Sequence, residues 1–306
     1  RNVVARNKGP LRDEEMLRLF REIMSACLAQ QEPLKVGFLG PEGTFTQTAV
    51  FKHFGHSVRP LPFHTIDEVF QEVESGVADF GVVPIENSTE GSVNNTLDMF
   101  LTSPLKIAGE IELRIEQHLL GQMKGMEGIE RICAHEQSLA QCRGWLREYL
   151  PHVELIGMSS NAAGARRARD EKGTAAIGPE VAADVYDLKI IVSGIEDRSD
   201  NSTRFLVVGR ELLAASGNDK TTLLVSTSDT GGGAGVLHHL LQPLAEHNVV
   251  MTFIESRPSR RKNWDYVFFI DIDGHANEAP VSDALAILEK ESSLFRVLGA
   301  YPKAIG

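Results

Sequence analysis

The chain has 306 residues, of which 42% are hydrophobic and 24% charged, and its formal net charge is −11. This composition is that of a globular protein of about two domains, and the negative charge argues against nucleic-acid binding through a basic surface. No apolar run approaches the roughly 18 residues that a membrane span needs. Cys27, Cys133 and Cys142 show no paired spacing, which indicates a reducing, cytoplasmic compartment rather than a disulfide framework or a zinc site.

Residues 1–34 predict a separate helical segment. Asp13 can cap a helix that Pro33 ends, and we expect the chain, which starts at Arg1 without an apolar leader, to be a fragment. One helix cannot bury an apolar face alone, so this face needs a partner in the same chain, in another chain or in sequence outside these residues. The apolar side chains recur at helical spacing: Met16, Leu19, Phe20, Ile23, Met24, Cys27 and Leu28.

Strand and helix patterns alternate between residues 35 and 210. This alternation predicts an α/β fold with mixed sheets, arranged as two lobes around a central cleft like a periplasmic binding protein. The expected strands are 35–39, 79–85, 106–116, 129–134, 153–156, 174–177, 189–192 and 203–208. The expected helices are 45–54, 65–76, 137–149, 159–171 and 179–186.

A polar linker at 211–219 precedes a different pattern, which we expect to form its own domain over residues 219–303. The order of strands and helices is β-α-β-β-α-β, which is typical of a ferredoxin-like module. The expected elements are 221–226, 235–246, 249–255, 266–273, 281–291 and 295–301.

Three polar runs each lie at the end of a strand or in a strand-to-helix turn, where open α/β folds place ligands. They are residues 40–45 (GPEGTF), 83–91 (VPIENSTEG) and 201–205 (NSTRF). Each run by itself is also explained by a turn or a helix cap, but together they indicate one site. Neither a metal nor a cofactor is expected, because no metal-ligand or nucleotide motif occurs. No Ser/His/Asp or Cys/His arrangement is evident, and His135 is interpreted as structural.

With a fourth run, residues 255–258 (ESRP), these motifs resemble the prephenate dehydratase family, and the resemblance covers about residues 35–303. Residues 1–34 resemble the end of the all-helical chorismate mutase domain that precedes the dehydratase in many bacterial proteins. Gln30 falls where the mutase family has an active-site side chain, but the long first mutase helix is absent here.

The resemblance implies decarboxylating dehydration of prephenate to phenylpyruvate in phenylalanine biosynthesis, without a cofactor. Two alternatives stay open: an arogenate dehydratase, and a non-catalytic protein that senses amino acids. The resemblance assigns Thr203 as the hydrogen-bond donor to the departing hydroxyl. Glu86 and Asn87 match positions that handle the substrate, and burial of Glu86 would make it a candidate acid.

Further positions are implied to bind substrate: Thr44, Ser88, Thr89, Gln141, Asn201 and Arg204. Arg204 can pair with a substrate carboxylate, although it can equally face outward. Ala134 stands where relatives often have serine, which removes one hydroxyl from the expected site.

The last module resembles an ACT domain, a regulatory fold that binds amino acids between two copies. In this family the ligand is phenylalanine, so the resemblance implies feedback inhibition of a homodimer or homotetramer. Val236 replaces the usual alanine and adds two methyl groups next to the ligand. The alternative is an assembly module with an inactive ligand site. The implied phenylalanine-binding residues are Gly235, Val236, Leu237, Glu255, Ser256, Arg257 and Pro258.

Overall fold

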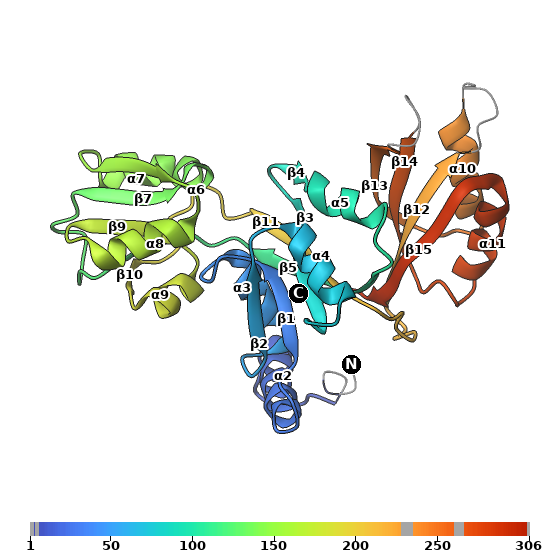
Figure 1. Cartoon of the computed structure of the whole chain (residues 1–306), viewed down its shortest axis with the longest axis horizontal. Coiled ribbons are helices and arrows are strands. Elements are labelled where there is room, and N and C mark those ends of the chain that lie inside the picture. Colours follow the sequence, from blue (N-terminus) through green and yellow to red (C-terminus); the bar gives the residue numbers. More distant parts are fainter. Residues whose placement is uncertain (1–2, 4–5, 228–234, 260–265, 305–306) are drawn as a thin grey trace.

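The computed structural model describes all residues except 1–2, 4–5, 228–234, 260–265 and 305–306. Three units built on β-sheets lie in a row, and helix α2 (Asp13–Ala29) projects from the middle unit (Figure 1). We call the middle unit the first lobe, the green unit the second lobe, and the orange and red unit the C-terminal domain. The predicted α/β class, with mixed sheets, two lobes and a βαββαβ module, is confirmed.

The first lobe is a sheet in the order β2-β1-β3-β11-β5, with the short β4 paired to β3. Strand β11 comes from far downstream and is antiparallel to both β3 and β5, so the third polar run lies beside the second. The strands are β1 (Lys35–Leu39), β2 (Arg59–Phe63), β3 (Phe80–Asn87), β4 (Gly91–Ser92), β5 (Lys106–Arg114) and β11 (Ser202–Gly209).

Helices cover the first-lobe sheet because each has an apolar stripe. In α4 this stripe is Ile66, Val69, Phe70 and Val73, all buried, and Thr65 caps the helix by accepting a hydrogen bond from the Glu68 amide at 3.1 Å. The strands at the centre of the lobe are buried on both faces. The helices are α3 (Phe45–Phe54), α4 (Ile66–Glu74) and α5 (Asn94–Phe100).

The second lobe is a five-stranded sheet in the order β10-β6-β9-β7-β8. The single helix expected at 137–149 is two helices, because the Asp197 carboxylate accepts from the amides of Gly144 and Trp145 at 2.8 and 2.9 Å and so caps a new helix. The strands are β6 (His118–Gly121), β7 (Arg131–His135), β8 (Glu154–Met158), β9 (Thr174–Gly178) and β10 (Lys189–Val192). The helices are α6 (Glu136–Gln141), α7 (Arg143–Tyr149), α8 (Asn161–Asp170) and α9 (Glu180–Tyr186).

Two segments, residues 115–117 and 193–201, cross between the lobes. They run side by side, because the Ile115 amide donates to the Asn201 carbonyl at 2.9 Å and the Ile195 amide donates to the Gln117 carbonyl at 2.8 Å. The two lobes are therefore joined by a hydrogen-bonded pair of chains rather than by two independent linkers.

The C-terminal domain is a four-stranded sheet in the order β13-β14-β12-β15. One face is covered by α10 (Val236–Glu246) and α11 (Val281–Glu291), which enclose their own apolar core. The other face packs on the first lobe, and Leu224, Phe269 and Leu298 join Phe100 and Ile107 in one continuous core. The strands are β12 (Asp219–Thr227), β13 (Met251–Pro258), β14 (Tyr266–Asp273) and β15 (Ser292–Pro302).

Helix α2 docks on the first lobe through its polar side. The Glu22 carboxylate lies 2.7 Å from Nδ1 of His56, and the Ser57 amide donates to Ser25 Oγ at 3.2 Å. Much of the apolar face that the sequence predicts for this helix is exposed, including Ile23 and Met24. No described residue therefore supplies the full partner that this face requires.

Candidate active site

A cavity of about 500 Å³ lies between the first and second lobes. This volume is within the usual range for small-molecule sites. Both lobes contribute polar side chains, and most of these follow the end of a strand or begin a helix. The first lobe supplies Thr44, Thr46, Asn87, Glu90, Ser92, Asn201 and Thr203, and the crossing segments and second lobe supply Gln117, His135, Gln137, Ser138, Gln141, Ser159, Ser160 and Asn161.

The predicted residues Asn87, Asn201 and Thr203 form one hydrogen-bonded group in this cavity. The Asn87 amide nitrogen donates to Thr203 Oγ1 at 2.8 Å and to Asn201 Oδ1 at 3.0 Å. The Asn87 oxygen accepts from the backbone amides of Thr89 and Glu90, which fixes the orientation of its amide. Because Thr203 accepts from Asn87, its own hydroxyl proton is free to point toward a ligand.

A bulge in β3 decides which side chains reach the cavity. Pro84 pairs with Phe205, but Glu86 pairs with Arg204, so Ile85 is an extra residue in β3. The bulge reverses the alternation of side chains and directs Asn87 to the cavity that Pro84 also lines. Glu86 lies on the other face of the strand and does not line the cavity. The structure thus argues against the predicted acid role of Glu86.

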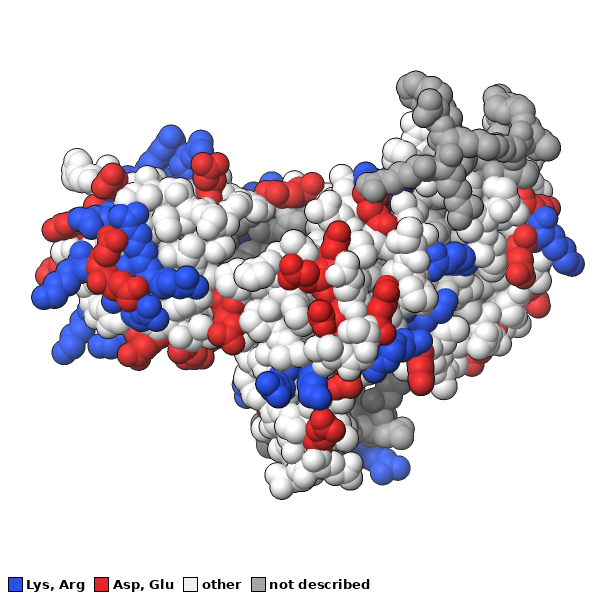
Figure 2. Space-filling model, in the orientation of Figure 1, with Lys and Arg blue, Asp and Glu red and all other residues white. Residues whose placement is uncertain are grey.

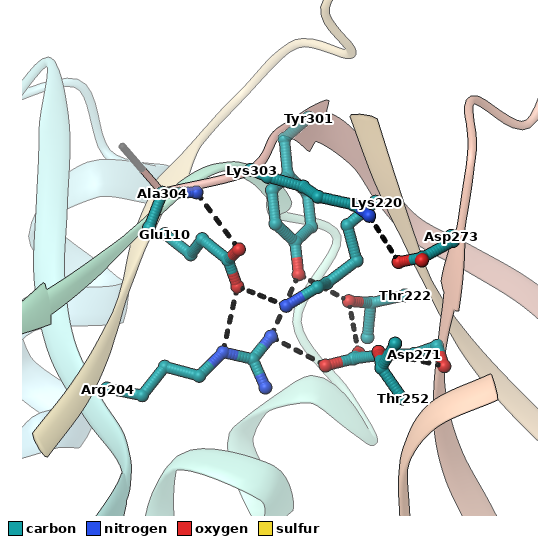
Figure 3. Close-up of polar contacts among 10 residues, drawn as sticks. All are labelled: Glu110, Arg204, Lys220, Thr222, Thr252, Asp271, Asp273, Tyr301, Lys303 and Ala304. Atoms are coloured by element: carbon teal, nitrogen blue, oxygen red, sulfur yellow. Dashed lines mark hydrogen bonds and ion pairs between the residues drawn. The ribbon is translucent and has the colours of Figure 1, made fainter. Parts of the chain in front are cut away.

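The structure places Arg204, which was predicted to bind substrate, outside the lining of this cavity. Strand residues alternate between faces, so Arg204 lies on the opposite face of β11 from Thr203. Its guanidinium is buried between the first lobe and the C-terminal domain, with Nε 2.9 Å from Glu110 and Nη2 2.5 Å from Asp271 (Figure 3).

Of the other predicted residues, Thr44 and Gln141 line the cavity, whereas Ser88 and Thr89 do not. Ser88 Oγ donates to Asn201 Oδ1 at 3.3 Å, and Thr89 Oγ1 donates to Asn87 Oδ1 at 2.6 Å. Both side chains therefore hold the lining residues in place from behind.

A second hydrogen-bonded group on the opposite wall contains the predicted Gln141 together with three residues that were not predicted, Gln117, Ser138 and Asn161. Ser138 Oγ accepts from Asn161 Nδ2 at 2.8 Å and from Gln117 Nε2 at 3.2 Å, and Gln117 Nε2 also donates to Gln141 Oε1 at 3.0 Å. His135, which was interpreted as structural, also lines the cavity. The available signal for Ser138 and Asn161 was their place in the first turns of α6 and α8, which follow strands; Gln117, in a crossing segment, gave no such signal.

The two buried cysteines cannot serve as nucleophiles here. Burial raises the pKa of Cys142 to about 12 and raises the pKa of Cys133 above its usual value. A thiol with a raised pKa stays protonated and unreactive near neutral pH. Within the described ranges, no group of three or more His, Cys, Asp and Glu side chains could hold a metal ion.

No lysine or arginine among the described residues lines the cavity. Positive potential comes instead from helix N-termini, and the ten-residue helices α3 and α8 begin at the cavity from opposite lobes. Thr44 precedes α3 without capping it through its side chain, whereas Ser160 accepts from the Ala163 amide at 3.0 Å in α8. The lining does contain the carboxylate of Glu90, whereas lysines and arginines lie elsewhere, for example interspersed with acidic residues over the outer surface of the second lobe (Figure 2).

A larger cavity of about 840 Å³ lies between α2, α3 and α9. Its lining is rich in charged side chains, such as Arg21, Lys52 and Asp184, and contains none of the predicted site residues. The cavity between the lobes is therefore the better candidate for the active site.

Two side chains of the predicted phenylalanine motif on β13 contact the first lobe. Glu255 accepts from Ser92 Oγ at 2.9 Å, and Arg257 forms a two-pronged ion pair with Asp98, with Nε 3.1 Å from Oδ1 and Nη2 2.9 Å from Oδ2. Gly235 and Leu237 flank the start of α10, and the side chain of Val236 lies outside the described part of the structure.

Residues 36–212 match the family model for prephenate dehydratase, and residues 233–290 match the model for the ACT domain. The chain belongs to the prephenate dehydratase family. It is 51% identical over its entire length to a bifunctional chorismate mutase/prephenate dehydratase of Pseudomonas aeruginosa, of which it covers 83%. It is 34% identical to a prephenate dehydratase of Bacillus subtilis over 88% of this chain and 98% of that protein.

Solved structures are similar to this chain over most of its length. A prephenate dehydratase from Arthrobacter aurescens in complex with L-Phe is 36% identical with a TM-score of 0.80, over 89% of this chain and 90% of that one. A structure described as GqqA, a novel type of quorum quenching acylase, is 28% identical with a TM-score of 0.81, over 88% of this chain and 98% of that one. No helix among the described residues is long and apolar enough to cross a membrane.

Proposed function

We propose that the chain converts prephenate to phenylpyruvate, carbon dioxide and water. Family membership, shown over more than half of the chain, supports this activity. The observation that carries the proposal is the Asn87–Thr203 hydrogen bond, because it leaves the Thr203 proton to a ligand in a cavity of suitable size.

The chemistry requires few protein groups. The ring carboxylate leaves as carbon dioxide, its bonding electrons complete the aromatic ring, and the hydroxyl on the opposite ring carbon departs and takes up a proton. A threonine hydroxyl is a weak acid, so Thr203 acts by donating a hydrogen bond to the departing oxygen or by relaying a proton. Such a donor, held in place before the reaction, stabilises the charge that develops on that oxygen.

Prephenate carries two carboxylates, and the cavity offers neutral donors rather than cationic side chains. Backbone amides at the N-termini of α3 and α8 suit this task, because they carry partial positive charge and face the cavity from opposite lobes. We infer that the two lobes hold the substrate between them and thereby align the ring hydroxyl with Thr203.

The second part of the proposal concerns regulation by phenylalanine through the C-terminal domain. The ACT match and the L-Phe complex of the Arthrobacter aurescens relative support it. The binding residues would be those of the 235–237 and 255–258 motifs. A cytoplasmic homodimer or homotetramer fits this regulation, and exposed apolar side chains on or beside the edge strand β13, such as Met251 and Ile254, support assembly.

Residues 1–34 would be part of a chorismate mutase domain. The match to the bifunctional Pseudomonas aeruginosa protein extends over them, and α2 leaves an apolar face exposed. The corresponding domain division is 1–34, 35–210 and 219–303, close to the ranges of the two family matches.

The first test measures phenylpyruvate formation by absorbance, with prephenate or arogenate as substrate and with or without phenylalanine. We expect turnover of prephenate that phenylalanine suppresses. If the chain turns over arogenate but not prephenate, its substrate is arogenate. If phenylalanine does not change the rate, the C-terminal domain is an assembly module without a regulatory role. An inactive protein that binds an amino acid would support a sensor. Acylase activity without turnover of prephenate would instead favour the activity named for GqqA.

A further inference from the structure

Arg204 joins the first lobe to the C-terminal domain at a point directly behind the candidate active site. Its guanidinium contacts Glu110 on β5, Asp271 on β14 and the Tyr301 hydroxyl on β15, the last at 3.2 Å (Figure 3). The guanidinium carbon also lies 5.8 Å from the centre of the Phe253 ring on β13. One side chain of β11 thus touches three of the four strands of the neighbouring sheet.

Arg204 is linked to the fourth strand, β12, through the carboxylate of Glu110, which it shares with Lys220. Glu110 accepts from Arg204 Nε at 2.9 Å and from Lys220 Nζ on β12 at 2.7 Å. Thr222, also on β12, donates to Asp271 at 2.6 Å and lies 2.8 Å from the Tyr301 hydroxyl. We call these six residues the Arg204 cluster: Glu110, Arg204, Lys220, Thr222, Asp271 and Tyr301.

The Arg204 cluster is balanced in charge and largely dry. Two cations face two carboxylates, and the side chains of Asp271 and Glu110 are 2% and 6% exposed. Removing one member would leave an uncompensated charge in a poorly solvated place, so each member of the cluster depends on its partners. The first lobe and the C-terminal domain also pack closely around the cluster. Gly299 on β15 lies against the Ile107 backbone, where no larger residue fits.

The Arg204 cluster can affect catalysis because Arg204 is the next residue after Thr203. Arg204 follows Thr203 directly on β11, so the same short stretch of backbone carries the hydroxyl that faces the cavity and the guanidinium that faces the C-terminal domain. Phe253 lies two residues before Glu255, at the start of the predicted phenylalanine motif on β13. A movement of β13 and β14 would therefore act on the backbone of Thr203.

We propose that Arg204 is a positioning residue for the reaction: through its cluster, the C-terminal domain sets the place of Thr203 and passes the state of its amino-acid site to the active site. The proposal rests on the proposed function. A misplacement of a catalytic group by about 1 Å can cost about a hundredfold in rate, so small shifts in the sheet suffice.

The decisive variants change the cluster from the C-terminal domain, at residues that do not line the cavity. Asp271→Asn keeps the shape and removes the charge that faces Arg204, and Tyr301→Phe removes only a hydroxyl. The matched control is Lys106→Met, because Lys106 Nζ donates across the same interface to the Val297 carbonyl at 3.0 Å, but at the opposite end of β11 beside Gly209. All variants are measured in the full chain for kcat and KM on prephenate, half-inhibiting phenylalanine concentration and Tm.

We expect Asp271→Asn to lower kcat about tenfold with little change in KM, because the substrate still binds while Thr203 is displaced. The half-inhibiting phenylalanine concentration should change by about fivefold or more. Tyr301→Phe should shift both quantities in the same direction by less. Lys106→Met should leave both near the wild-type values even if Tm falls.

Two results would overturn the inference. One is a folded Asp271→Asn variant, or a folded Tyr301→Phe variant should the first not fold, with wild-type kcat and wild-type inhibition. The other is an equal loss in Lys106→Met, which would show a general effect of a weakened interface. A wild-type chain that does not act on prephenate would instead refute the proposed function, so the two failures are distinguishable.

Discussion

The two faces of strand β11 differ in the charge of their side chains, although the two residues compared, Thr203 and Arg204, are adjacent in the sequence. The cavity face presents Thr203, which is neutral and accepts a hydrogen bond from the side-chain amide of Asn87. The opposite face presents Arg204, which is charged and paired with two carboxylates. Neutral donors therefore face the anionic substrate of the proposed reaction, while the charges are used where they hold two domains together.

This comparison shows that neighbours within one motif need not share a role. A strand sends successive side chains to opposite faces, so residues 201–205 serve both the cavity and the domain interface. A charged side chain next to a catalytic position is then no evidence of a substrate carboxylate. Its partner is decided by what lies on its own face of the sheet.

The cavity face is tested most directly by Thr203→Val, which keeps the shape and removes the hydroxyl. We expect kcat to fall about 10²- to 10³-fold, the usual effect of losing one donor to developing charge. Thr203→Ser restores a hydroxyl and should recover much of the rate. Steady-state phenylpyruvate formation measures both, and a Val variant with wild-type kcat would remove Thr203 from the mechanism.

The interface face is tested by Glu110→Gln. Removing this carboxylate leaves Lys220 without its close partner and weakens the hold on Arg204. Breaking a buried ion pair costs about 3 kcal/mol or more in the free energy of unfolding. Urea unfolding followed by circular dichroism measures the loss, and a change below about 1 kcal/mol would mean that the interface is well solvated.

The same glutamate predicts a pH dependence. Burial by itself would raise the pKa of Glu110, but Arg204 and Lys220 outweigh it and hold the pKa below the usual value. The unfolded chain then takes up a proton at about pH 4.3 while the folded chain does not, so the stabilisation is complete above that pH and is lost as the pH falls further. Urea unfolding across this acidic range should show a shallower loss for Glu110→Gln than for the wild type.

A smaller effect on the cavity face is expected for Asn87→Asp. A carboxylate cannot donate to Thr203 and would instead accept the hydroxyl proton that the substrate needs. We expect kcat to fall about tenfold, as when a catalytic hydrogen bond is redirected. The pH profile of kcat checks the reason, because activity should recover partly at low pH, where the aspartate is protonated and can donate. A flat profile would contradict it.

The smallest effect is expected for Glu86→Gln. This side chain lies outside the cavity lining, on the same face of the sheet as Arg204. The pH–rate profile should therefore match that of the wild type within about twofold, since a side chain that does not reach the cavity cannot exchange a proton with the substrate there. If the acidic side of the pH–rate profile shifts, Glu86 becomes a candidate acid again. Strand β3 would then have to adopt a different conformation.

The fold could be predicted in large part because its signals are local. Alternating strands and helices, the Thr65 cap and the βαββαβ order all depend on neighbours in the sequence. The elements that were missed, such as β2 and β6, are short or contain prolines and depend on pairing with distant strands. The division of helix 137–149 likewise depends on Asp197, which is more than fifty residues away from the amides it caps.

The sequence by itself determined the family and the two-lobed plan. It also indicated the central residues of the candidate site, because Asn87, Asn201 and Thr203 lie in motifs that can be recognised in the sequence. Only the tertiary structure decided which way each side chain points. The bulge at Ile85 turns Asn87 into the cavity and Glu86 out of it, and the C-terminal sheet provides carboxylates that draw Arg204 away from the substrate. Both effects arise from pairing between distant strands, and a one-dimensional pattern contains no record of that pairing.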